Sequence, residues 1–77
     1  MHIKTWHVQL FIYEDDDRTS AHAVLHADSP EPKEGHGSAA RAPRDLVMSE
    51  IGDEVAAARA LRTLADVLLR TAADDIS

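Results

Sequence analysis

The chain contains no cysteine among its 77 residues. This absence excludes a disulfide framework, a thiol nucleophile and a zinc site built on cysteine thiolates. Aromatic residues are nearly as scarce, with one Trp, one Tyr and one Phe. A chain of this length buries only about 60% of the surface that its unfolded form exposes, so we expect a single small domain that benefits from a partner subunit.

Long apolar runs and an excess of basic residues are also absent. The opening residues MHIKTWHVQLFIYE alternate in polarity, whereas a membrane-spanning helix needs about 20 consecutive apolar residues and a signal peptide needs an apolar core. We therefore expect a protein of the reducing cytosol, neither secreted nor inserted in a membrane. The 8 Lys and Arg against 14 Asp and Glu give a net charge of −6, which argues against strong nucleic-acid binding.

Two segments show the period-two alternation of half-buried strands. The first, residues 5–14, places large apolar side chains at every second position: Trp6, Val8, Leu10 and Ile12. The second, residues 18–27, follows a short acidic turn, so the two are expected to pair as an antiparallel hairpin. A third, shorter strand is predicted over residues 36–42, after a loop that is rich in proline and glycine.

One long helix is predicted over residues 50–73, with acidic residues in its first turns and arginines later, as the helix dipole favours. Nine of its apolar residues fall in one broad arc: Ile51, Val55, Ala58, Leu61, Ala65, Leu68, Leu69, Ala72 and Ile76. We expect this arc to cover the first strand, with Trp6 as the anchor of the core. The predicted fold is a two-layer α+β domain, a three-stranded antiparallel sheet (β-β-β-α) covered on one face by a C-terminal helix.

The opposite face of that sheet has an unusual composition for a solvated surface. It would display His7, Gln9, Phe11, Tyr13, His22, Val24 and His26. We interpret it as a dimer or partner face, because aromatic patches on small domains mark protein interfaces. Three alternatives remain: a surface without function, a stacking platform for single-stranded RNA, and a metal site. The last is disfavoured because His22 and His26 lie roughly 13 Å apart along one strand.

No catalytic pattern is present, and we expect a protein without enzymatic activity, metal, cofactor or small-molecule substrate. The residues GHG lack the lysine and hydroxyl that end a phosphate-binding loop. Most of the positive charge is carried by five arginines, which an RNA or ribosome binder would use: Arg41, Arg44, Arg59, Arg62 and Arg70. Because the chain is acidic, we expect such binding to be weak, and it is the alternative function.

Three stretches of the chain resemble a family of short actinobacterial proteins of unknown function with a dsRBD-like fold. They are TWHVQLFIYEDDDRTSAHAVL, GHGSAARAPRD and EIGDEVAAARALRTLADVLL. The matching positions are Trp6 and Val8, Thr19 to Leu25 (with His22 and Val24 at the variable places), Gly35 to Arg41, Pro43 and Asp45, Ile51 to Glu54, and Ala58 to Leu61. The pair of IGDE…ARAL and GxGxxAR motifs is the most specific part of this resemblance.

The resemblance implies a single dsRBD-like domain over residues 1–77, cytosolic and homodimeric. One relative has been likened in fold to ribosome hibernation factors and linked to dormancy under low oxygen. Those factors hold ribosomal RNA with basic surfaces, whereas this chain is acidic. From the residues and the resemblance together, we expect a non-enzymatic homodimer that acts through protein–protein contacts, as a stress or dormancy factor, with ribosome or RNA binding as the alternative.

Overall fold

The computed structural model describes residues 1–28, 30–40 and 49–76. Three strands are followed by one helix: β1 (His7–Glu14), β2 (Arg18–His26), β3 (Lys33–Ala40) and α1 (Ser49–Ile76). The predicted fold class is confirmed, since α1 packs on a three-stranded antiparallel sheet. The third strand lies nearer the N-terminus than predicted, and the helix runs three residues beyond its predicted end.

The sheet has the strand order β1-β2-β3, so β2 is central and both its neighbours are edge strands. Opposite residues of paired strands point to the same face. Ala23 of β2 lies between Leu10 and Gly35, and His22 lies between Phe11 and His36. The two sheet faces are thereby defined, one carrying Ala23 and the helix, the other carrying His22.

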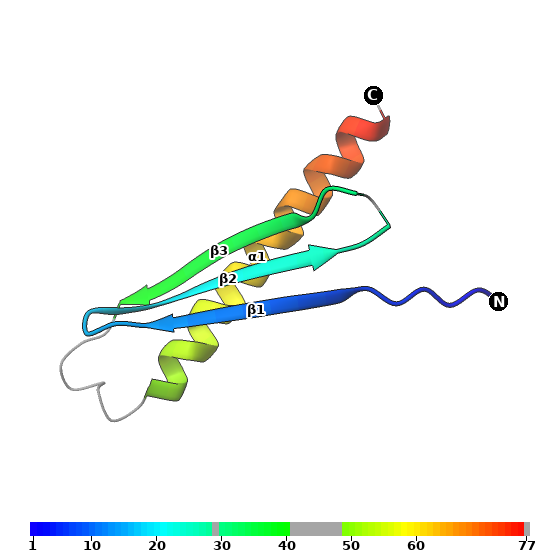
Figure 1. Cartoon of the computed structure of the whole chain (residues 1–77). Coiled ribbons are helices and arrows are strands. Elements are labelled where there is room, and N and C mark those ends of the chain that lie inside the picture. Colours follow the sequence, from blue (N-terminus) through cyan, green and yellow to red (C-terminus); the bar gives the residue numbers. More distant parts are fainter. Residues whose placement is uncertain (29, 41–48, 77) are drawn as a thin grey trace.

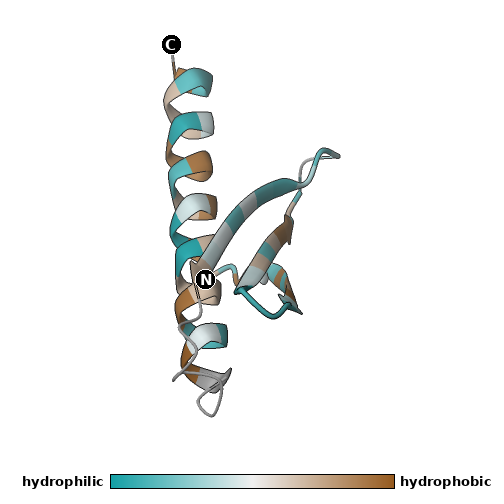
Figure 2. Cartoon of the chain, turned by 90° about the vertical axis from the view of Figure 1, so that its left-hand side faces the viewer, coloured by the Kyte–Doolittle hydropathy of each residue, from teal (hydrophilic) through white to brown (hydrophobic). Residues whose placement is uncertain are grey.

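Helix α1 crosses the sheet at an angle, and its C-terminal turns extend beyond the strands (Figure 1). It lies over β2 and β3 and only touches β1. The second view shows the helix on one face of the sheet, with the other face uncovered (Figure 2). We call this uncovered side the open face.

The buried core is built mainly from small side chains. Its members in the described residues are Ala21, Ala23, Leu25, Ala39, Ala56, Ala60 and Leu64. They surround Gly35 and Gly37, which let the helix backbone approach β3 closely. A β-carbon on Gly37 would lie 2.7 Å from the Ala56 carbonyl oxygen, closer than van der Waals contact allows.

The prediction that the helix covers the first strand is wrong. Trp6 is 51% exposed, and Val8, Leu10 and Ile12 are each exposed as well. The predicted helix arc is wrong in large part, because Ile51, Leu61 and Leu69 are exposed while Ala56 and Ala60 face the sheet. Val55 and Leu68 are the members of the arc that pack against the core. The reason is steric. Where a helix packs closely against glycines, its smallest residues lie at the contact, whereas a prediction from hydrophobicity alone places the larger apolar residues there.

Candidate interaction face

A row of three rings crosses the open face, one from each strand. Phe11, His22 and His36 are directly opposite one another in the two strand pairs. The His22 and His36 rings are stacked, with centroids 4.2 Å apart and an interplanar angle of 12°. Phe11 is tilted against His22 at 6.1 Å. Together they place one ring on each strand in a line across the open face.

The central ring of this row is held by a carboxylate. His22 Nε2 lies 2.9 Å from Glu34 Oε1. Because an ionised carboxylate only accepts hydrogen bonds, His22 carries a hydrogen on Nε2. The half-buried imidazole is thus fixed between a hydrogen bond on one side and the stacked ring of His36 on the other.

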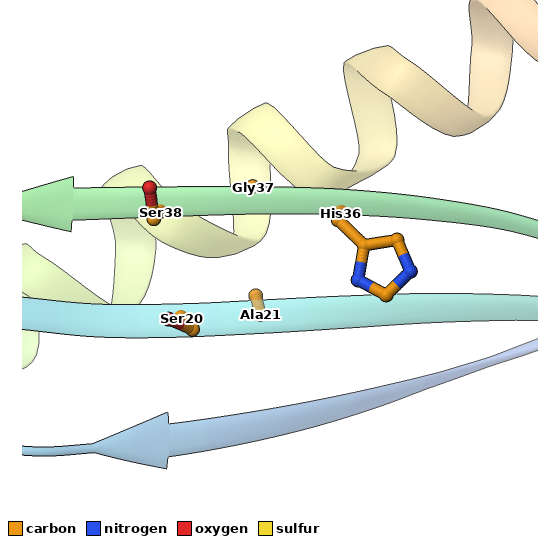
Figure 3. Close-up of a pocket in the computed structure, with 5 residues that line it drawn as sticks. All are labelled: Ser20, Ala21, His36, Gly37 and Ser38. Atoms are coloured by element: carbon orange, nitrogen blue, oxygen red, sulfur yellow. The ribbon is translucent and has the colours of Figure 1, made fainter.

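A shallow hollow lies beside the row, where the His36 ring extends from β3 toward β2 (Figure 3). Its lining residues are Ser20, Ala21, His36, Gly37 and Ser38. The hollow has a volume of about 250 Å³, below the roughly 300–1,000 Å³ of typical small-molecule sites. Its size and openness favour a contact surface for a larger partner.

The structure places the predicted partner-face residues on one side of the sheet, with one exception in accessibility. His7 and His26 are paired directly across β1 and β2, and both are exposed. Gln9, Phe11 and Tyr13 are exposed along β1. Val24 is only 8% exposed, so it supports this face from within and is not available to a partner.

Sequence reasoning missed two members of this face, Glu34 and His36. The prediction started the third strand at His36, whereas β3 begins at Lys33. The signal was present in the alternation of Glu34, His36 and Ser38 with two glycines and an alanine. A period of two can be recognised even when one face of a strand carries only glycine and alanine.

The predicted arginine surface is only partly available. Arg59 donates a hydrogen bond from Nη1 to the Ser38 carbonyl oxygen at 2.7 Å. The guanidinium of Arg59 is therefore engaged at β3, because its long side chain reaches the edge of the sheet. Arg62 and Arg70 are exposed on α1. Arg41 and Arg44 lie outside the described residues.

Two negative findings apply to the part of the chain that the structure describes. No helix within it has both the length and the apolar character to cross a membrane. Within the same residues, no three His, Asp or Glu side chains come together in a way that could hold a metal ion.

These features define a class: a small α+β domain with a three-stranded antiparallel sheet, one long C-terminal helix and an uncovered sheet face. The family model described as Rv2632c-like matches residues 4–77. The chain therefore belongs to the Rv2632c-like family.

Two mycobacterial relatives have the same similarity to this chain. They are "Uncharacterized protein Rv2632c" of Mycobacterium tuberculosis (strain H37Rv) and "Uncharacterized protein Mb2665c" of Mycobacterium bovis. Each is 40% identical over 73 residues, which cover 95% of this chain and 77% of the relative. The predicted actinobacterial affinity is confirmed at this level.

A solved structure shares the architecture. The crystal structure of Rv2632c matches with a TM-score of 0.89 and 38% sequence identity, over 99% of this chain and 89% of the other. The likeness confirms the arrangement of one long helix on a three-stranded antiparallel sheet.

Proposed function

We propose that this protein is a non-enzymatic, cytosolic homodimer that acts by binding another protein through the open face of its sheet. The observation that carries the proposal is the ring row of Phe11, His22 and His36. Interface centres are enriched in aromatic side chains and depleted in Lys and Glu. A preorganised row also reduces the entropy that side chains lose on binding.

The surroundings of the row support a protein partner. Tyr13 is 58% exposed at one end of β1, and its phenol offers both apolar area and a hydrogen-bonding group. The adjacent hollow beside His36 could accept a single partner side chain. The stress or dormancy role implied by the family resemblance, together with the dsRBD-like description, belongs to this proposal.

The test is affinity purification of the tagged protein from its native cells. The parent should retain a specific protein, and a Phe11→Ser, His36→Ser double variant should lose it. Arg62→Glu is the matched control, since it alters an exposed residue on the helix and leaves the open face intact. A partner retained equally by the double variant would refute the open face as the binding surface.

Nuclease treatment before elution distinguishes a protein partner from the RNA-binding alternative. A protein partner should remain bound after RNA is digested. Ribosomal components that disappear on digestion would instead support the RNA-binding alternative, in which Arg62 and Arg70 are the exposed cations of α1.

A further inference from the structure

A second apolar surface lies on the helix side of the sheet, opposite the open face. Val8, Leu10 and Ile12 share this side with the buried Leu25, Ala23 and Ala21, their partners in β2. They are nevertheless 43%, 39% and 43% exposed, because α1 lies over β2 and β3. The apolar side of β1 is thus left uncovered within one protomer.

The helix carries the complementary half of this surface. Arg59 reaches the outer edge of β3, so the opposite flank of α1, which lies about 180–200° away around the helix, turns toward β1. That flank includes Leu61, which is 41% exposed, and the half-buried Leu68. Leu69 is 70% exposed and Ile51 54% exposed on the adjoining outer side.

The spacing of these helix residues is typical of a helix pair. Ile51, Ala58, Ala65 and Ala72 recur every seventh residue, and all four are exposed. Leu61 and Leu68 follow two of them by three residues, which completes an a/d pattern. Alanines at the a positions would allow the backbones of two helices to come close together.

The area is of the size that a small symmetric dimer requires. The six exposed side chains of Val8, Leu10, Ile12, Ile51, Leu61 and Leu69 present an apolar area on the order of 500 Å², against roughly 800 Å² in total per partner at a standard interface. The first and last d positions of the pattern are charged, Glu54 and Asp75, and both are exposed near the two ends of the helix.

We infer that a second copy of this chain covers this surface. The inference rests on the homodimer of the proposed function and assigns its interface to the α1 stripe (Ile51, Ala58, Leu61, Ala65, Leu68, Leu69 and Ala72) and the helix side of β1. A two-fold axis near the middle of the stripe pairs the two helices, and the flank of each helix meets β1 of the partner. The open face then remains free for a different protein.

The first experiment measures mass by light scattering at high micromolar concentration. The parent should be a dimer, and a Leu61→Glu, Leu69→Glu double variant should be a monomer with an unchanged circular dichroism spectrum. The single variant Leu69→Glu distinguishes loss of the dimer from loss of the fold, because Leu69 contributes little to the packing of its own protomer. Thr63→Glu is the matched control, since it adds a carboxylate to an exposed site on the same helix outside the stripe.

The second experiment uses the absence of cysteine, which makes any introduced thiol unique. Residues near a two-fold axis meet their own copies, so one of Ala58→Cys, Ala65→Cys and Ala72→Cys should form a disulfide-linked dimer on mild oxidation. Tyr13→Cys on the open face should not.

The outcomes separate this inference from the proposed function. A dimer that resists the double glutamate variant but dissociates with Phe11→Glu moves the interface to the open face, which overturns the inference and leaves the homodimer standing. A parent that is monomeric at high micromolar concentration overturns both. Dissociation by Leu61→Glu, Leu69→Glu together with a cross-link through the alanine stripe supports the assignment.

Discussion

Gly37 of β3 lies directly against Ala60 of α1, so close that a β-carbon on the glycine would overlap the Ala60 amide nitrogen. The helix and the sheet therefore meet through their backbones at this point. Gly35 makes the equivalent approach one helical turn further on, where a β-carbon would lie 2.5 Å from the Ala60 carbonyl oxygen. The position of α1 over β3 is fixed by these two glycines.

Gly37→Ala should destabilise the fold by about 3 kcal/mol, the upper end of the usual cost of overpacking, because the added methyl group meets helix backbone that cannot move aside independently. Urea denaturation of the purified variant measures the loss. His36→Ala is the control, since the neighbouring residue faces the open side of the sheet and should cost far less. Equal stability of Gly37→Ala and the parent would show that α1 stands further from β3.

Leu64→Ala should be more costly than Trp6→Ala. Leu64 is 3% exposed in the core, and truncation of a buried leucine costs about 2–5 kcal/mol. Trp6 is half exposed, so its removal should cost about 1–2 kcal/mol, below the usual 3–5 for a buried aromatic residue. Chemical denaturation of the two variants at one protein concentration gives the two losses of stability. A larger loss for Trp6→Ala would show that Trp6 belongs to the core.

Arg59→Met should lower stability by about 1 kcal/mol, the net contribution of a typical hydrogen bond. The variant keeps the aliphatic length of the side chain but loses the bond to the Ser38 carbonyl, which lies on an edge strand. Faster exchange of amide hydrogens in β3 should accompany the loss. Arg62→Met, at an exposed position on the same helix, should change neither quantity.

An Arg62→Glu, Arg70→Glu double variant tests the ribosome-binding alternative. The net charge of −6 predicts weak binding of the parent to ribosomes even at low salt. Titration of both proteins into ribosomes at two salt concentrations measures the difference. Tight, salt-dependent binding by the parent that the double variant loses would favour the alternative function over protein–protein contacts.

Much of the architecture could be predicted from the sequence because alternation and helical periodicity are local properties. The hairpin of β1 and β2 and the long helix follow from such patterns. The face of the helix that meets the sheet could not be predicted in the same way. Which face of the helix meets the sheet depends on Gly35 and Gly37, because their lack of a side chain matters only where β3 packs against α1.

The candidate interaction face was predicted in part for the same reason. Phe11 and His22 could be placed on it because they belong to the two strands of a hairpin. His36 and Glu34 required the register of β3 against β2, which no local pattern specifies. The hydrogen bond from Arg59 to the Ser38 carbonyl likewise depends on tertiary structure, because it joins α1 to β3.

The alanine-rich core has a consequence for how the protein responds to temperature. The heat capacity change of unfolding grows with the apolar area exposed, and is about 12–15 cal/mol/K per residue in ordinary domains. A protomer that buries mostly methyl groups against glycine should fall below that range and have a flat stability curve. Association of two protomers through larger apolar side chains would raise the heat capacity change and the curvature of the stability curve. A calorimetric scan therefore reports whether each protomer completes its apolar burial only in the dimer.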